Sequence, residues 1–358
     1  MKTIVILMGL AATAAAQTRA VKQEGPAPRP DKASLKAAKP GAPVVTFRGG
    51  TEVGFDDNIL ELNDKQISQL EDGNRPEKFR IDDPGDVVYS VWADVRVKGF
   101  LFREPTSAGL KVQPYLYQDS SIANYEEYEL FIRQDLGSHE VGVEIGLERD
   151  VYLRELEIVV PGPNLWESAF YDEVEMELYY KHRLHPNVTL RGSIGYLIRD
   201  FDSPFGFRDR EGVVLGLEPG FDLGKGWKAF VRYEYADQKA DASDFEADTS
   251  YTEHEFELGA AVDLLAKQLE LSLRYRIAFR DYTTSNDPAF DPSHADREDL
   301  RQRVIFAVKV KLSKAWSAEA AWEFRDVDSD RPFDDDATTS EPGDSTRNLV
   351  TLGVTFSL

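Results

Sequence analysis

Long stretches of this sequence alternate between apolar and polar residues. In residues 86–101, every odd position from Val87 to Leu101 holds Val, Tyr, Ala, Gly or Leu, whereas most even positions hold a charged or polar residue. Residues 173–181 and 269–280 follow the same pattern. A period of two is that of a β-strand with one apolar and one polar face. Such segments run to about 11 to 14 residues, longer than the roughly five or six of soluble sheets and enough for the roughly 9 to 11 tilted residues that cross a bilayer.

The alternation predicts about fourteen strands. They cover roughly 44–55, 86–101, 108–118, 126–136, 139–152, 168–183, 188–200, 211–222, 226–237, 253–264, 268–282, 300–312, 316–326 and 346–358. Short turns such as Gly137-Ser138 alternate with long polar loops such as 56–85 and 327–345. An even strand number with this layout is typical of a bacterial outer-membrane β-barrel. The barrel must close, because an open sheet edge in hydrocarbon leaves N–H and C=O groups unpaired, at several kcal/mol each.

Prolines and one long hairpin modify this plan. Pro114 and Pro219 each remove a donor from the ladder, so we expect bulges or strand ends there, and twelve or sixteen strands remain alternatives. In residues 139–183 the alternation continues to Val159, reverses at a Pro-Gly-Pro-Asn stretch and resumes near Trp166. This segment predicts a hairpin that projects well beyond the membrane.

The alternative fold is a soluble β-sandwich, in which two apolar faces pack together. The heavily charged opposite faces of the strands argue against this fold.

Composition excludes several other classes of protein. The chain has 358 residues, 64 of them acidic and 42 basic, for a formal net charge of −22. Such a balance argues against nucleic acid as a partner, because Lys and Arg supply most of that affinity. Without cysteine, the chain has no disulfide scaffold, thiol chemistry or thiolate metal site. It also has no apolar run of about 18 residues or more, which a membrane-spanning helix requires.

The two ends of the chain carry export signals. Residues 1–16 have a basic start, a short apolar core and small residues before Gln17, which is the pattern of a secretory signal peptide. Residues 17–43, rich in Pro, Ala and Lys, are expected to form a periplasmic linker, and residues 44–358 the transmembrane barrel with long acidic extracellular loops. The last strand ends on apolar residues up to Leu358. It resembles the C-terminal signal through which the barrel assembly machinery receives its substrates, although Phe356 stands two residues before the end.

The charged faces are expected to line an aqueous lumen, because Arg or Lys on the lipid face costs about 2 to 4 kcal/mol at the bilayer midplane. The expected acidic wall, on the fourth to sixth strands, consists of Glu127, Glu129, Glu144, Glu148, Glu173, Glu175 and Glu177. The expected basic wall, on the eleventh and twelfth strands, consists of Arg274, Arg276, Arg280, Arg303, Lys309 and Lys311. In a ring of fourteen strands these walls face each other, which predicts a transverse field across a pore. The alternative is a lumen filled by ion pairs between adjacent strands.

Aromatic residues on the polar register suggest a second role for the lumen. Trp92, Tyr115, Tyr117 and Tyr179 occupy such positions, where their rings could stack on the faces of sugars. The alternative is that they serve only packing or belong to an interfacial girdle.

The first strand and its exit carry a resemblance to a known family. The stretch from Gly50 to Leu60 reads GTEVGFDDNIL. It resembles the opening of the β-barrel porin 2 type of outer-membrane protein, in which a G-[YF]-D-D-N-[IVL] sequence begins the barrel. Members of that group are associated with exopolysaccharide export, so the resemblance implies a polysaccharide conduit. It implies no catalytic residue.

The sequence therefore predicts an outer-membrane channel for hydrophilic solutes, with export of a polysaccharide as a narrower hypothesis. The alternative is a closed structural or adhesive barrel that acts through its extracellular loops. We expect no enzymatic activity, no cofactor and no metal site, because the five histidines lack ligand spacing. The expected partners are outer-membrane lipid and lipopolysaccharide, the barrel assembly machinery and components of polysaccharide export.

Overall fold

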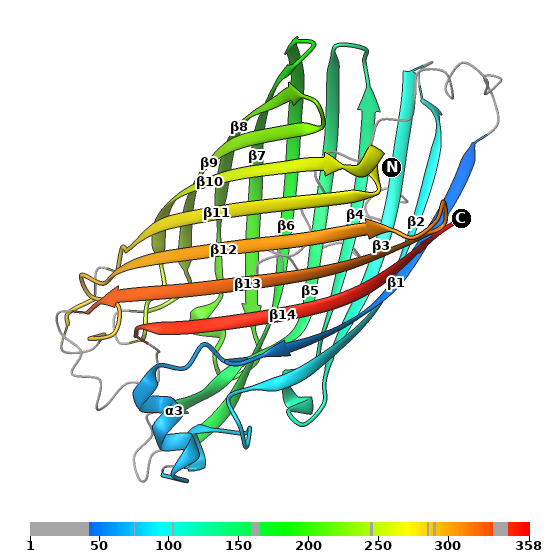
Figure 1. Ribbon diagram of the computed structural model, residues 1–358. Coiled ribbons are helices and arrows are strands. Elements are labelled where there is room, and N and C mark those ends of the chain that lie inside the picture. Colours follow the sequence, from blue (N-terminus) through cyan, green and yellow to red (C-terminus); the bar gives the residue numbers. More distant parts are fainter. Residues whose placement is uncertain are drawn as a thin grey trace.

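Fourteen antiparallel strands form one closed barrel, in which each strand pairs with its neighbours in sequence and β1 pairs with β14 (Figure 1). The computed structural model describes residues 43–358 except 75, 102–103, 159–164, 244–245, 285, 289–290 and 332–342. The expected signal peptide and nearly all of the linker lie outside these residues. The strands are β1 (Val44–Asp56), β2 (Asp86–Leu101), β3 (Glu104–Tyr117), β4 (Tyr125–Asp135), β5 (His139–Ile158), β6 (Leu165–His185), β7 (Val188–Phe201), β8 (Arg210–Gly224), β9 (Trp227–Ala240), β10 (Tyr251–Leu264), β11 (Leu269–Tyr282), β12 (Glu298–Lys311), β13 (Trp316–Asp330) and β14 (Ser345–Ser357). The predicted closed barrel of fourteen strands is thus confirmed.

The two ends of the barrel differ. Tight connections join β4 to β5, β6 to β7, β8 to β9, β10 to β11 and β12 to β13 at what we call the turn end, where β1 also begins (Figure 1). Longer connections lie at the opposite end, the loop end. Among the described residues, the helices are α3 (Asp64–Glu71), η1 (Pro76–Lys78), η2 (Ser121–Ala123), η3 (Gly206–Arg208) and η4 (Leu265–Lys267). Short periplasmic turns and long extracellular loops are typical of outer-membrane barrels, so the loop end faces outward from the cell.

The outer surface of the barrel is apolar. Val91, Leu258 and Leu352 expose 59%, 54% and 58% of their surface, whereas their neighbours Trp92 and Glu257 are buried on the inner face. A belt of this kind is stable only in hydrocarbon, because a water-soluble protein exposes few contiguous large apolar side chains. The alternation thus separates a lipid-facing from a lumen-facing surface, and the protein is an outer-membrane β-barrel. Among the described residues, no helix is both long and apolar enough to cross a membrane.

The expectation for the two prolines is wrong in its detail. Pro114 and Pro219 lie within β3 and β8 rather than at strand ends. The ladder between β2 and β3 loses two pairs around Pro114 and then resumes in the same register. The ladder between β8 and β9 does the same at Pro219. A proline removes only its own N–H, and the flanking pairs hold the register across the gap, so neither a bulge nor a strand end is needed.

The long hairpin is confirmed as far as it is described, although its expected Pro-Gly-Pro-Asn reversal lies outside the described residues. β5 extends to Ile158 and β6 begins at Leu165. The alternation predicted through this region is interrupted, however, because register shifts occur between Glu148 and Val151 and between Tyr152 and Arg154. Each shift inserts one extra residue into β5, which bends the strand and increases its twist. Beyond the bulges, Leu156 and Ala169 pack in a small apolar cluster with Phe205 of the connection between β7 and β8.

Candidate functional site in the barrel lumen

The seven glutamates of the expected acidic wall lie on β4, β5 and β6, and most of them contact cations on nearby strands. Lys111 Nζ of β3 lies 3.4 Å from Glu127 and 2.7 Å from Glu129. Arg191 of β7 pairs with Glu144 at 3.1 Å and also with Glu177. Arg199 of β7 pairs with Glu173. Glu148 and Glu175 are buried on the same inner face.

The basic wall is neutralised in the same way. On its loop side, Arg280 pairs with Glu253 at 2.8 Å. The remaining pairs are Arg276 with Glu255 and Glu257, Arg274 with Glu257, Arg303 with Glu323, and Lys309 with Glu319. Lys311 is exposed at the turn end. The strand order does place the two walls on opposite sides of the ring. Because each wall is largely paired with residues of adjacent strands, ion-pair ladders line the inner face, and the transverse field across a pore stays a prediction.

One ion pair reaches past two strands. The guanidinium of Arg232 on β9 lies 3.8 Å from Glu177 on β6. The inner positions of β7 and β8 near this contact include Ser193, Gly195 and Gly216. Their small side chains leave the space that the arginine crosses. Charged side chains therefore extend into the lumen at this level.

Four inner aromatic residues lie over glycines of the adjacent strand. The cross-strand pairs are Trp92 with Gly50, Phe131 with Gly109, Tyr179 with Gly142, and Phe230 with Gly259. A Cβ atom on any of these glycines would lie within about 2.0 to 2.6 Å of the ring. The rings thus lie flat on the barrel wall, as aromatic residues do when they cover glycines in sheets. Two of the four expected sugar-stacking residues, Trp92 and Tyr179, belong to this group, and the latter also lies 4.0 Å below the Arg191 guanidinium.

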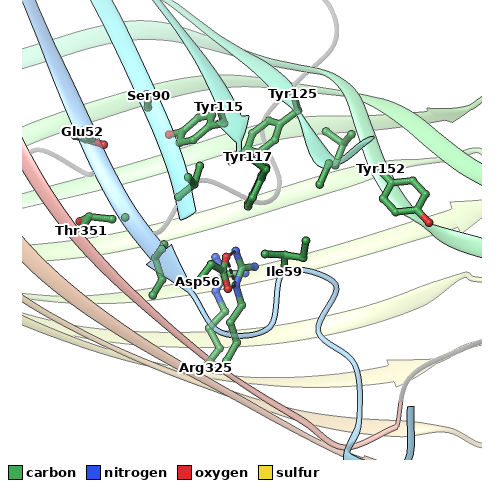
Figure 2. A pocket seen from close by; sticks show the side chains of 16 residues that line it. Glu52, Asp56, Ile59, Ser90, Tyr115, Tyr117, Tyr125, Tyr152, Arg325 and Thr351 are labelled. Atoms are coloured by element: carbon green, nitrogen blue, oxygen red, sulfur yellow. Dashed lines mark hydrogen bonds and ion pairs between the residues drawn. The ribbon is translucent and has the colours of Figure 1, made fainter. Parts of the chain in front are cut away.

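The other two expected sugar-stacking residues meet at the loop end. Tyr115 and Tyr117 line a cavity together with Tyr125, and the rings of Tyr115 and Tyr125 stack 4.5 Å apart. Figure 2 shows these tyrosines on one side of the cavity and Asp56 and Arg325 on the other. The cavity has a volume of about 60 Å³. A water molecule needs about 10 to 15 Å³ by this measure, so the cavity has room for a few waters.

The connection between β1 and β2, residues 57–85, folds over this cavity and caps the barrel mouth. Asn58 directs the fold: its side-chain amide donates to the carbonyls of Leu62 and Thr346, both at 2.8 Å, and its side-chain oxygen accepts from the N–H of Leu62 at 2.8 Å. Leu60 and Leu62 are then buried against Tyr117 and other residues of the wall. We call residues 58–62 the cap segment.

The cap segment also carries a carboxylate into the mouth. Glu61 Oε1 lies 2.8 Å from Arg325 on β13 and 3.2 Å from Arg347 on β14. Burial alone would raise the pKa of Glu61, but the guanidinium groups of Arg325, Arg347 and Arg301 hold it well below its usual range. The ion pair therefore persists at pH values at which an ordinary glutamate becomes protonated.

On the other side of the mouth, the cap reaches the projecting hairpin. Arg154 on β5 donates to the Leu60 carbonyl at 3.1 Å. Arg80 lies 3.6 Å from Glu155, and Lys78 stands 5.1 Å from the centre of the Trp166 ring. The connection thus spans from β13 and β14 to β5 and β6, which lie far apart in the ring. The bulged hairpin provides the surface on which the cap rests.

Sequence reasoning missed Glu61, Arg325 and Arg347. The two arginines occupy inward positions of the thirteenth and fourteenth predicted strands, so extending the analysis of alternating positions to those strands would have found them. No signal in the sequence marks Glu61, because nothing local shows that its loop turns inward.

The Asp-Asp-Asn stretch that carried the family resemblance has a clear structural role. The Nε–H of Arg347 is shared between the two carboxylate oxygens of Asp56, at 2.9 and 3.0 Å, and Asp57 accepts from the backbone N–H of Asn348.

No protein-family model and no curated protein matches this chain. Among solved structures, it is similar to a loop-deletion variant of OmpT from Vibrio cholerae, with 11% identity, coverage of 88% of this chain and 100% of that chain, and a TM-score of 0.46. It is similar to the outer membrane channel DcaP of Acinetobacter baumannii, with 11% identity, 88% and 98% coverage, and a TM-score of 0.47. It is also similar to an anion-selective porin from Comamonas acidovorans, with 11% identity, 88% and 99% coverage, and a TM-score of 0.43. At these values the similarity is one of general barrel architecture.

Proposed function

We propose that this protein is a non-enzymatic channel that passes hydrophilic solutes across the outer membrane. The observation that carries the proposal is the polar inner face of a closed fourteen-strand barrel. Eight-stranded barrels are just wide enough for side chains to fill, and the diameter grows with strand number. The charged inner residues pair mostly between adjacent strands, so the surface that encloses the lumen is polar. Such a lumen favours polar solutes over apolar ones.

The chain has no cysteine, which allows a direct test of the channel. Ser193 faces the lumen on β7, and the next residue, Ile194, is exposed on the lipid face. We expect Ser193→Cys channels in planar bilayers to lose about half of their conductance or more when a bulky charged thiol reagent is added, because the new group narrows the aqueous path. Ile194→Cys is the matched control and should not respond. Absence of any conductance both in the unmodified protein and in the variant that lacks residues 63–80 would refute the channel.

The capped mouth supports the second candidate, a closed structural or adhesive barrel. The described residues of the connection between β1 and β2 pack over the cavity of about 60 Å³ at the loop end. A barrel that stays capped would act through its surface alone. Deletion of residues 63–80 separates the two proposals, since a capped channel should gain conductance, whereas a barrel with a filled lumen should remain silent.

A polysaccharide is a narrower proposal for the solute. Support comes from the family resemblance of residues 50–60 and from the tyrosines at the mouth. The proposed partners are outer-membrane lipid and lipopolysaccharide around the apolar belt, the barrel assembly machinery through the last strand, and components of polysaccharide export. Glycan release from cells that carry or lack the protein would test the export role, and unchanged release would reject it.

A further inference from the structure

The arginines at the barrel mouth outnumber the carboxylates that the wall itself supplies. β12, β13 and β14 contribute Arg303, Arg325 and Arg347 to one connected group of charges. The wall supplies two carboxylates to this group, Glu323 on β13 and Asp56 on β1. The third carboxylate, Glu61, comes from the cap segment. Among the described residues, Glu61 therefore supplies the negative charge that balances the three arginines of this group.

The surroundings of this group suit a polar ring. The cavity beside Arg325 and Arg347 is lined on the far side by Tyr115 and Tyr125, whose rings stack on each other (Figure 2). Its remaining lining mixes polar groups, namely Glu52, Asp56, Ser90, Tyr117 and Thr351, with apolar side chains such as Ile59, Val88 and Leu349. A saccharide matches this mixture, because its hydroxyl groups can hydrogen-bond to polar side chains while its C–H faces pack against apolar and aromatic ones. Planar guanidinium groups bind carboxylates in a bidentate manner.

We propose that Arg325 and Arg347 form the binding point for the carboxylate of an acidic saccharide, and that Glu61 occupies this point in the empty channel. This inference rests on the proposed function as a hydrophilic channel and names its solute class. A sugar acid that reaches the mouth from the lumen replaces Glu61 at the two guanidinium groups. The cap segment then loses its ionic contact with β13 and β14, so that solute binding and release of the cap are one event.

The test compares D-galacturonate with D-galactose, which differ only in the carboxylate at C6. In single-channel recordings we expect galacturonate to cause transient blocks and galactose to cause none at the same concentration. Glu61→Gln should lower the apparent Kd for galacturonate about tenfold, because the competing charge is removed. Arg325→Gln with Arg347→Gln should raise it about tenfold or more. Glu71→Gln, on the exposed last residue of α3, is the matched control and should leave the Kd unchanged.

A second measurement does not depend on conductance or on the arginine variants. Hydrogen exchange in residues 59–62 should rise when galacturonate is added to the wild-type protein and should not respond to galactose. Tighter binding of trigalacturonate than of the monomer would assign the site to a sugar-acid chain, and equal binding would assign it to a free sugar acid; both support the proposal.

Three outcomes would overturn the inference. Equal block by galacturonate and galactose would show that the site does not recognise the carboxylate. Block by benzoate as strong as that by galacturonate would show that the site does not select a saccharide ring over an apolar one. An unchanged Kd in Glu61→Gln would show that Glu61 does not compete. A protein that never conducts refutes the proposed function instead, while the exchange response to galacturonate still decides whether the site binds a sugar acid.

Discussion

At the scale of single residues, the inner wall is organised by close contacts between adjacent strands. Tyr179 illustrates this: its ring lies between Gly142 and the guanidinium of Arg191, and its hydroxyl donates to Glu140 at 3.1 Å. The glycine is needed because no Cβ fits beneath the ring. An inward-facing aromatic residue can therefore pack against the barrel wall. Its position along the strand does not distinguish this packing role from stacking on a ligand.

A substitution at Gly142 tests this role. A Cβ atom at Gly142 would lie 2.5 Å from the Tyr179 ring, so Gly142→Val should displace the ring and lower the free energy of unfolding by about 1 to 3 kcal/mol. Urea unfolding in lipid vesicles measures the change. The control is Gly192→Val, because a Cβ at Gly192 meets nothing within 4 Å. Equal stability of the two variants would show that the ring does not depend on the glycine.

At the scale of elements, the connection between β1 and β2 behaves as a structural unit with two anchors. One anchor is the set of hydrogen bonds made by Asn58 together with the Glu61 ion pairs, and the other is the contact with the hairpin of β5 and β6. Between them, α3 begins at its own N-cap, Asn63, whose side chain accepts from the N–H of Gln66 at 2.8 Å. The cap segment and α3 are thus held by different asparagines.

Because Asn58 holds the cap segment and Asn63 caps α3, substitutions at the two asparagines should affect different parts of the connection. Asn58→Ala removes three hydrogen bonds, each worth about 1 kcal/mol, so hydrogen exchange in residues 59–62 should become at least about tenfold faster. Asn63→Ala should accelerate exchange only within α3, because it removes the helix cap and leaves the cap segment anchored. Exchange by mass spectrometry resolves the two segments. If both variants loosen residues 59–62 equally, Asn58 is not the anchor that the structure indicates.

At the scale of the whole molecule, the barrel depends on one surface meeting lipid and the other meeting polar groups. The belt includes Leu258 in the middle of β10 and Leu223 near the turn end of β8. Both are exposed on the outer face. The penalty for a charge on this face depends on depth, since the interface is more polar than the bilayer centre.

The depth dependence is measurable. Leu258→Arg should lower the free energy of unfolding by about 2 to 4 kcal/mol, and Leu223→Arg by about 0 to 1 kcal/mol. The measurement is urea unfolding in vesicles of fixed lipid composition. In detergent micelles, which adapt around a charge, the difference should shrink. A smaller penalty at Leu258 than at Leu223 in vesicles would contradict the assigned position of the belt.

The sequence by itself determined the closed barrel, its fourteen strands and which side chains face inward. These features follow from alternation along single strands. In a bilayer, the apolar side chains of each strand must face lipid, and the polar side chains must face the lumen. Only the tertiary structure decided that charges of the two walls are paired with neighbours, that Trp92 and Tyr179 cover glycines and that Glu61 enters the mouth. Such contacts depend on strand register and on how a long connection closes, and they join residues far apart in the chain. Glu61 and Arg347 are a clear case, because no pattern local to either residue encodes their meeting.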